Sequence, residues 1–345
     1  MGVITQLPIP AFFQADRVGE VWRVSYQTRA VEAQAWAKQH GILPTANDTV
    51  KICLMAIDVQ NTFCIPDFEL FVGGRSGRGA VEDNVRLCEF VYRNLPYLTA
   101  IAPTMDTHTA AQIFHPAFWV DESGNHPPAM TMIEPDDVPC QWRVNPLIAA
   151  SLGYEPGLLQ IYAEHYVRQL SQDGKFPLTI WPFHSMLGGI GHALVSAFEE
   201  ACFFHNLARQ SQTRFEIKGS NPLTENYSVL RPEVLVDQES KSIAQKNTSF
   251  LQKLLEFDYL IIAGQAKSHC VAWTIDDLLS EIQAIDSTLA QKVYLLEDCT
   301  SPVVVPNVVD FTESGDAAFD RFAKAGMHLV KSTDAIESWP DLKLK

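Results

Sequence analysis

The sequence has few cysteines, and no two of them form a C-x-x-C motif. The seven cysteines are odd in number and widely spread, at positions 53, 64, 88, 140, 202, 270 and 299. This pattern argues against both a disulfide framework and a cysteine-rich zinc site. We therefore expect most of them to be reduced thiols in packed positions.

Basic residues are also scarce, with 26 Lys and Arg against 41 Asp and Glu, for a net charge of −15. A surface of this sign repels phosphate backbones and anionic lipids, so we expect neither nucleic acid nor a membrane as a partner. The first twenty residues contain neither a basic n-region with a continuous apolar core nor a long apolar run. The default expectation is a soluble cytoplasmic protein.

The remaining composition is that of a folded protein with a sizeable core, because 47% of the residues are hydrophobic and 19% are charged. Short apolar runs typical of buried parallel strands lie at 51–58, 98–106, 214–219, 259–264, 292–298 and 327–332. Helical patterns lie between them, at 80–94, 188–208, 241–256, 270–284 and 314–325. This alternation predicts the α/β class, with a three-layer, doubly wound sheet of about six mainly parallel strands.

Two segments fall outside this rhythm. Residues 1–50 hold one helical stretch, "YQTRAVEAQAWAKQHG", which ends on a glycine as helices often do. Residues 116–178 begin rich in proline and continue with the helical pattern "PGLLQIYAEHYVRQLSQDGK". We interpret 1–50 as an N-terminal extension and 51–345 as one domain with a large insertion at about 116–178.

Polar side chains follow four of the predicted strands. Asp58 follows the first, Asp106 and His108 end the second, Lys218 ends the third, and "AGQAKSH" leads from the fourth to Cys270. Taken singly, such residues are usually turn caps, solvated lysines or packed thiols. Ligands bind at the carboxyl ends of the strands in open parallel sheets, so their occurrence together at this edge favours function.

Three of these residues could carry out acyl transfer. A cysteine at a helix N-terminus beside an ammonium group has a lowered pKa, so we expect Cys270 to be available as a thiolate near neutral pH. An aspartate such as Asp58 can accept the thiol proton and later return it to a leaving amine. With Lys218, these residues form a candidate triad that contains no histidine.

The other polar residues resemble a metal site. Asp106 and His108 are two positions apart on a strand, so both side chains leave the same face. His184, in "IWPFHSM", is a third candidate ligand, and His115 is a less certain fourth. One carboxylate with two or three imidazoles suits Zn²⁺, with Fe²⁺ or Mn²⁺ as alternatives.

These residues lie in five segments that resemble the isochorismatase-like superfamily of cysteine hydrolases, and among them the nicotinamidases most closely. The segments occur in the family's order: "IDVQNTF" (57–63), "MDTHTAAQIFH" (105–115), "WPFHSMLGGIG" (181–191), "IKGSNPLTENYS" (217–228) and "AGQAKSHCVAWTIDDL" (263–278). The resemblance implies the isochorismatase-like hydrolase fold, a catalytic triad of Asp58, Lys218 and Cys270, and a divalent metal, zinc in the first place.

The resemblance also implies how the substrate is held. The metal, on Asp106, His108 and His184, would contact the pyridine nitrogen of nicotinamide. A cis peptide bond would precede Ala266, whose N–H would form an oxyanion hole with that of Cys270. Three aromatic residues would wall the flat ring: Phe63, Trp181 and Tyr227. His269 is interpreted as a packing residue.

The sequence departs from the family at Ser185, where nicotinamidases usually carry cysteine, and at Thr107, where they usually carry an aromatic residue. The insertion begins at the metal-binding loop, so we expect it to cover or rebuild the mouth of the pocket. The glycine-rich "GGRSGRG" (73–79) does not fit a nucleotide-binding motif, and we interpret it as a loop near the active-site rim. Arg75 or Arg78 on this loop could contact an anionic substrate group.

The sequence thus predicts a cysteine-dependent amidohydrolase of small carboxamides, with nicotinamide converted to nicotinate and ammonia through a thioester. The alternatives are a hydrolase of another small amide or a carbamoyl or ureido compound, and a non-catalytic binding protein on the same fold. We also expect a homo-oligomer, with exposed aromatic residues of the N-terminal extension as an interface: Phe12, Phe13 and Trp22.

Overall fold

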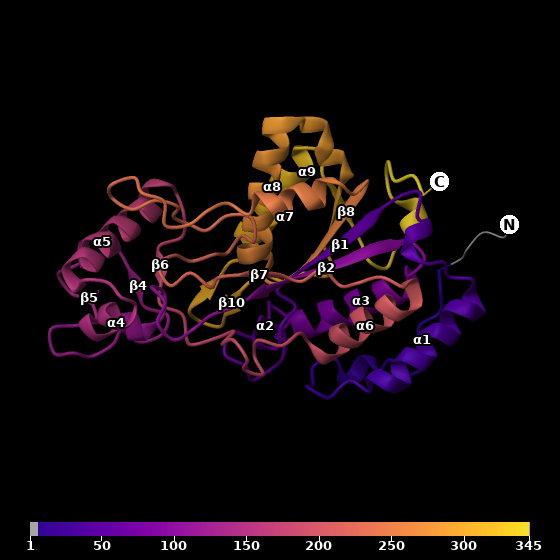
Figure 1. Cartoon of the computed structure of the whole chain (residues 1–345), viewed down its shortest axis with the longest axis horizontal. Coiled ribbons are helices and arrows are strands. Elements are labelled where there is room, and N and C mark those ends of the chain that lie inside the picture. Colours follow the sequence, from indigo (N-terminus) through magenta and orange to yellow (C-terminus); the bar gives the residue numbers. More distant parts are fainter. Residues whose placement is uncertain (1–5, 345) are drawn as a thin grey trace.

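In the computed structural model, which describes residues 6–344, a six-stranded sheet runs through the centre of the molecule (Figure 1). The strand order is β12-β9-β8-β1-β2-β7, and every neighbouring pair is parallel. The strands are β1 (Ile52–Ile57), β2 (Leu98–Asp106), β7 (Glu216–Lys218), β8 (Tyr259–Gly264), β9 (Val293–Leu296) and β12 (His328–Val330). The predicted fold class is confirmed.

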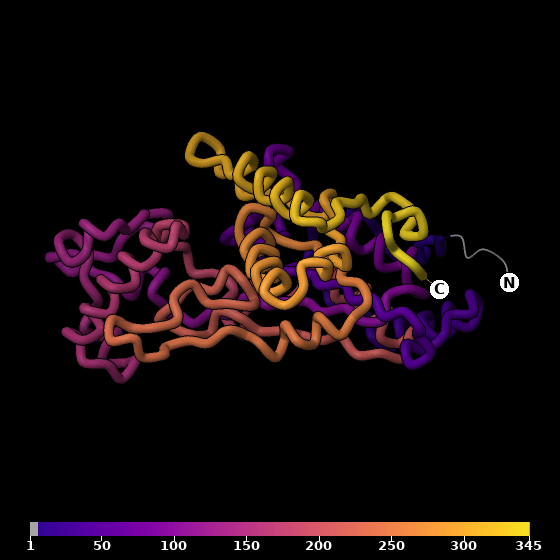
Figure 2. The backbone as a smooth tube through the Cα atoms, turned by 90° about the horizontal axis from the view of Figure 1, so that it is seen from above, coloured from indigo at the N-terminus to yellow at the C-terminus, as the bar shows by residue number. Residues whose placement is uncertain are grey.

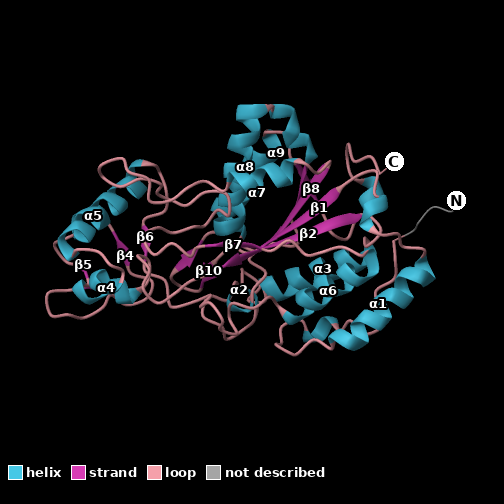
Figure 3. Cartoon of the chain, viewed as in Figure 1, coloured by secondary structure: helices cyan, strands magenta, loops and turns pink. Residues whose placement is uncertain are grey.

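Helices cover both faces of this sheet and make three layers (Figure 3). One face is covered by α3 (Gly79–Arg93) and α6 (Ser196–Arg209), and α1 (Tyr26–His40) packs on the outer side of α6. The other face is covered by α7 (Thr248–Leu255), α8 (Ala272–Ile285) and α9 (Thr312–Lys324).

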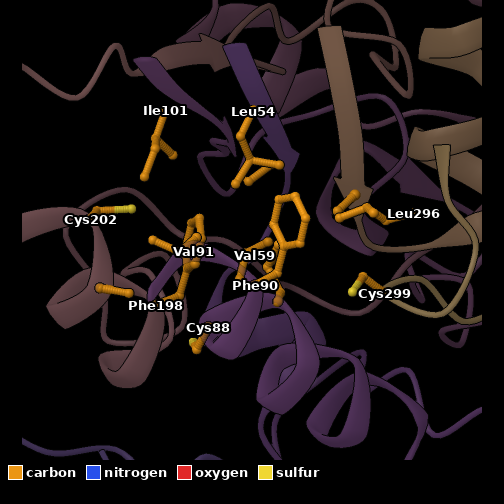
Figure 4. Packing of buried hydrophobic residues seen from close by; sticks show 14 of the residues in the cluster. Leu54, Val59, Cys88, Phe90, Val91, Ile101, Phe198, Cys202, Leu296 and Cys299 are labelled. Atoms are coloured by element: carbon orange, nitrogen blue, oxygen red, sulfur yellow. The ribbon is translucent and has the colours of Figure 1, made fainter. Parts of the chain in front are cut away.

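The central strand explains why the sequence is continuously apolar here. In β1, Leu54 and Ala56 face the layer of α3 and α6, while Cys53 and Met55 face the layer of α7, α8 and α9. Since both faces are buried, both sets of alternating side chains are apolar. Figure 4 shows the first hydrophobic core, on the α3 and α6 side of the sheet, to which Leu54 of β1, Phe90 of α3 and Phe198 of α6 all belong.

Two of the expected helices begin later than predicted. The helix expected at 188–208 starts at Ser196. The glycine-rich segment before it is not helical and instead forms backbone hydrogen bonds with the start of the short helix α2 (Asn61–Cys64). The N–H of Asn61 donates to Ala193 O and that of Thr62 to Gly191 O. The helix expected at 241–256 starts at Thr248, where the Asn247 side chain caps it by accepting a hydrogen bond from Phe250 N.

The N-terminal extension packs against the α3 and α6 layer. Helix α1 ends as expected, with Gly41 in the left-handed conformation at φ 64°. The prediction that Phe12, Phe13 and Trp22 are exposed is wrong, because all three are partly buried against the first core. The ring centre of Phe12, for example, lies 5.3 Å from that of Phe204 in α6, so the extension packs its aromatic side chains against the core of its own chain.

Residues 116–178 fold into a separate group of elements at the end of the molecule away from both termini, in Figures 1 and 2. They comprise β3 (Trp119–Val120), β4 (Met132–Ile133), β5 (Arg143–Val144), β6 (Leu178–Thr179), α4 (Pro146–Ser151) and α5 (Pro156–Gln172). Trp119 and Tyr166 are fully buried in a third hydrophobic cluster that these elements share with their flanking loops. None of the helices within 6–344 has the length and hydrophobicity needed to span a lipid bilayer.

Candidate active site

The carboxyl ends of β1, β2, β7 and β8 bring the candidate triad together. Asp58 follows β1, Lys218 ends β7, and Cys270 lies in the π-helical turn Lys267–Val271 between β8 and α8. The Lys218 ammonium lies 3.0 Å from Asp58 Oδ2, 3.6 Å from Cys270 Sγ and 2.8 Å from Asp106 Oδ1. It also donates to Asn226 O at 2.9 Å. One buried cation therefore joins the triad to the first candidate metal ligand.

Asp58 is held by its neighbouring strand. Its backbone N–H donates to Thr104 Oγ1 at 3.0 Å, and the Thr104 hydroxyl donates to Asp58 Oδ1 at 2.6 Å. Its backbone adopts φ 48°, a left-handed conformation that aspartate tolerates better than most residues. These contacts fix the carboxylate at the end of β1, with its second oxygen directed at Lys218.

Burial dominates the electrostatics of these groups. It raises the pKa of Asp58, although Lys218 and Thr104 act in the opposite direction. Burial would also raise the pKa of Asp106, but His108 and Lys218 outweigh it and hold that pKa well below its usual range. For Lys218, burial is outweighed by the carboxylates of Asp106 and Asp58, which raise the pKa of the ammonium well above its ordinary value.

The expectation of a ready thiolate at Cys270 is wrong. The thiol is buried, and this burial raises its pKa well above the ordinary value despite the nearby Lys218 ammonium. The negative charges of Asp58 and Asp106 raise it further. The direction of this shift favours the protonated thiol at neutral pH.

The three expected metal ligands also converge. One ligand atom from each of Asp106, His108 and His184 can be chosen so that all three lie within 4.8 Å of one another, and all three residues are buried. Asp106 Oδ2 lies 2.7 Å from His108 Nε2 and 3.5 Å from His184 Nε2. The other ring nitrogens contact backbone oxygens, His108 Nδ1 at Gly219 O (3.0 Å) and His184 Nδ1 at Pro182 O (2.8 Å).

These contacts fit a bound cation. A carbonyl oxygen only accepts hydrogen bonds, so each Nδ1 carries a proton, and Nε2 is the nitrogen whose lone pair each ring would offer to a metal. Burial lowers the pKa of His184 and so favours the neutral form that a metal requires. Two lone pairs and a carboxylate oxygen thus point at one place. Gly219, at φ 82°, makes room, since a Cβ there would lie 2.6 Å from His108 Cε1.

His115, the fourth candidate ligand, lies beside this set and not within it. Its ring centre is 5.8 Å from that of His108 and 5.6 Å from that of His184. Burial lowers its pKa to about 3, so the ring is neutral at physiological pH. Its Nδ1 contacts Thr109 O at 3.1 Å, and its buried Nε2 has no hydrogen-bond partner among the described residues.

A cavity of about 380 Å³ opens beside Cys270 and the candidate metal ligands. The three aromatic residues expected to wall a flat ring, Phe63, Trp181 and Tyr227, all line it. The insertion contributes Met130, and a small hairpin of β10 (Val304–Val305) and β11 (Val309–Asp310) contributes Val304 and Val305. Further apolar lining residues are Phe68, Leu70, Phe71, Val72, Phe114 and Val303.

The turn before Cys270 contains the expected cis peptide bond, between Gln265 and Ala266. Ala266 and Cys270 both line the cavity. His269, interpreted from the sequence as a packing residue, also lines it. Its Nδ1 lies 2.9 Å from the Ser268 hydroxyl, and burial lowers its pKa to about 4, so a neutral imidazole stands in the wall.

The sequence reasoning missed residues that hold the site from behind. Gln60 clamps the end of β2: its Nε2 donates to Asp106 O at 2.8 Å, and its Oε1 accepts from Asp106 N at 2.7 Å. Thr104 could have been found, because it precedes Asp106 by two positions and so shares its face. Arg75 pairs with Asp310 at 2.7 Å, and of the described residues neither Arg75 nor Arg78 lines the cavity.

The chain matches no family model, and no curated protein matches it in sequence. It is similar to the structure of a nicotinamidase and pyrazinamidase from Acinetobacter baumanii, at 16% identity over 82% of this chain and 97% of that chain, with a TM-score of 0.48. It is also similar to the yeast nicotinamidase bound to the inhibitor nicotinaldehyde, at 16% identity over 81% of this chain and 99% of that chain, with a TM-score of 0.48. A third similar structure is an isochorismatase-like hydrolase from Alkaliphilus metalliredigens, at 11% identity over 82% of this chain and 95% of that chain, with a TM-score of 0.41. Each of these is a likeness of overall architecture.

Proposed function

We propose that this protein is a cysteine-dependent amidohydrolase that converts a small aromatic carboxamide to the acid and ammonia. The observation that carries the proposal is the meeting of Asp58, Lys218 and Cys270 around one buried ammonium, at the wall of a cavity. A nucleophile, a base and a fixed positive charge within contact distance are the parts that acyl transfer requires.

In the proposed reaction Cys270 begins as a thiol. Asp58 accepts the thiol proton while the sulfur forms a bond to the amide carbon, whose oxygen becomes negatively charged. The N–H groups of Ala266 and Cys270, two residues that line the cavity, are proposed to stabilise that oxygen. Asp58 then returns the proton to the nitrogen, the carbon–nitrogen bond breaks, and ammonia leaves a thioester on Cys270.

Water completes the cycle. Asp58, now ionised again, takes a proton from a water molecule as the water oxygen attacks the thioester carbon. The carbon–sulfur bond breaks, the acid leaves, and the proton returns to the Cys270 sulfur. Lys218 keeps its charge throughout, because Asp106 and Asp58 hold its pKa well above its ordinary value.

Asp106, His108 and His184 are proposed to hold one divalent transition metal, zinc in the first place and iron or manganese as alternatives. When bound, such an ion offers open coordination positions to a water molecule or to a neutral ring nitrogen of the substrate. With Phe63, Trp181 and Tyr227 around the ring, nicotinamide is the substrate we propose first.

The size of the cavity favours a second candidate substrate class. A volume of about 380 Å³ lies within the range of about 300–1,000 Å³ that holds drug-sized ligands. A substituted or longer amide, or a ureido compound, therefore also fits. Both candidates use the same triad and differ only in what occupies the apolar side of the cavity.

The test is ammonia release from nicotinamide, substituted carboxamides and ureido compounds, by wild type and Cys270→Ala, with metal content measured on the same samples. We expect release by wild type only. Release from larger amides but not from nicotinamide would keep the triad and replace the substrate. If the metal-loaded wild type released no ammonia from any of them, the amidohydrolase proposal would be refuted.

A further inference from the structure

A buried carboxyl group, Glu225, lies at the wall of the cavity and is not used by the proposed reaction. Only 3% of the residue is exposed, and it is one of the lining residues. Its Oε1 accepts hydrogen bonds from the hydroxyl of Tyr227 (2.8 Å) and from Trp181 Nε1 (3.3 Å). Its Oε2 accepts from the Tyr166 hydroxyl at 3.1 Å. Three aromatic side chains therefore meet at one carboxyl group.

Two of these aromatics are walls of the cavity. Trp181 Nε1 also donates to the Tyr227 hydroxyl at 3.0 Å, so the indole, the phenol and Glu225 form a closed triangle. A buried N–H or O–H without a partner is costly, so each ring is held in the orientation that keeps its hydrogen bond. Glu225 thereby holds the plane of the Trp181 indole and the position of the Tyr227 hydroxyl, in the wall that a flat substrate would meet.

The third aromatic, Tyr166, comes from the insertion. It lies on α5, and the N–H of Glu225 donates to its hydroxyl at 3.0 Å. One turn earlier on the same helix, the Tyr162 hydroxyl donates to Leu223 O at 2.8 Å. The next residue after Glu225 is Asn226, whose carbonyl accepts from the Lys218 ammonium. Helix α5 is thus joined by hydrogen bonds to the segment 223–227. This segment supplies Glu225 and Tyr227 to the cavity wall and the carbonyl oxygen that accepts from Lys218.

The charge state of Glu225 follows from its surroundings. Burial raises its pKa to about 8, and the nearby Glu233 adds to this, while Tyr227, Tyr166 and Trp181 act in the opposite direction. Glu233 is itself paired with Lys175 at 3.0 Å. At neutral pH the uncharged form therefore predominates, in which the proton on Oε2 would be donated to the Tyr166 hydroxyl. A glutamine would preserve the shape and this charge, with its oxygen facing Tyr227 and Trp181 and its amide N–H facing Tyr166.

We propose that Glu225 is a positioning residue through which the insertion helix α5 sets the orientation of Trp181 and Tyr227, and so the affinity of the cavity for a planar ring. The claim about affinity rests on the proposed function, whereas the claim about ring orientation does not. The insertion then has a role in substrate selection that its distance from Cys270 in the sequence conceals.

The experiment compares Glu225→Ala, Glu225→Gln and Tyr166→Phe with the matched control Tyr154→Phe, whose ring is 44% exposed just before α5. With nicotinamide as substrate, Glu225→Ala should raise KM by about tenfold or more, since the Tyr227 hydroxyl loses its acceptor and the Trp181 N–H loses one of its two. The turnover number should stay within about threefold, because the triad is untouched. Glu225→Gln should restore KM, Tyr166→Phe should fall between, and the control should match wild type.

A second readout does not need turnover. Solvent exchange of the Trp181 indole proton, assigned by Trp181→Phe and followed by NMR among the seven tryptophans, should become faster in Glu225→Ala and return towards wild type in Glu225→Gln. The proposal is overturned if this signal is unchanged, or if all the indole protons accelerate together, as general destabilisation would cause. If wild type releases no ammonia from any amide, the proposed function fails, while the indole signal still decides the positioning role.

Discussion

Lys218 is the residue whose removal should disturb this protein most informatively. Its ammonium lies 3.0 Å from Asp58 Oδ2 and 2.8 Å from Asp106 Oδ1, and all three side chains are buried. At an effective dielectric constant of about 20, each of these ion pairs contributes roughly 5 kcal/mol of attraction. In Lys218→Met the two carboxylates face each other without a cation, and breaking a buried pair in this way typically costs about 3–5 kcal/mol.

The loss should depend on pH. Burial already raises the pKa of Asp58, and loss of the Lys218 ammonium, which acts in the opposite direction, raises it further above that of the unfolded chain. The folded variant then binds more protons than the unfolded one, and its stability falls as pH rises. Urea unfolding of metal-free protein should therefore show a smaller deficit for Lys218→Met at pH 5.5 than at pH 7.5. Adding Asp58→Asn should recover part of the deficit at pH 7.5.

The matched control is Lys246→Met, which breaks an ion pair of 2.6 Å with Glu281 in which the lysine side chain is 45% exposed. Exposed pairs contribute up to about 1 kcal/mol, so this variant should lie close to wild type. The reasoning would be refuted if the deficit of Lys218→Met were the same at both pH values, or no larger than that of the control.

Three further predictions concern the metal, a buried histidine and a buried arginine. His184→Ala should lower the bound metal, measured by elemental analysis, by at least tenfold while circular dichroism stays unchanged; retained metal would contradict the assigned ligand set. Burial lowers the pKa of His205 to about 4, so the free energy of unfolding should fall as pH drops from about 6.5 to 4. At pH 5, calorimetry in two buffers should show that His205→Gln takes up about one proton fewer on unfolding than wild type does. Equal proton uptake by the two proteins would exclude a neutral His205 in the folded state. Arg209→Met, which leaves Asp48 without its partner at 2.6 Å, should cost about 3–5 kcal/mol in urea unfolding, and a loss below about 1 kcal/mol would show that water replaces the pair.

Much of the fold was predictable because parallel strands that are buried on both faces have apolar residues at almost every position, which appear in the sequence as continuous apolar runs. Each of the six predicted runs contains one strand of the sheet. The grouping of Asp58, Asp106 and Lys218 followed from the predicted strands, because the carboxyl ends of parallel strands lie at one edge of the sheet. Their chemical roles remain predictions.

The remaining features depend on three-dimensional surroundings that no local pattern records. The raised pKa of Cys270 results from burial, whereas the sequence shows only its place before a helix and a lysine elsewhere. The first residues of the expected helix at 188–208 are not helical, because backbone carbonyls of this segment accept hydrogen bonds from Asn61 and Thr62, which are far away in the chain. Of the partners of Glu225, only Tyr227 lies in "LTENYS"; Tyr166 comes from α5 and Trp181 from the segment after the insertion, so the local sequence does not reveal the group.

The position of β1 between β2 and β8 has a consequence for assembly. A cut at the exposed turn 238–241 would leave β1, β2 and β7, with Asp58 and Lys218, in one fragment, and β8, β9 and β12, with Cys270, in the other. The pairing of β1 with β8 alone joins the two halves of the sheet. Folding must therefore close a loop of about 200 residues before the triad exists, which favours slow folding. Neither fragment alone would contain Asp58, Lys218 and Cys270, so these three residues can meet only when the two halves associate.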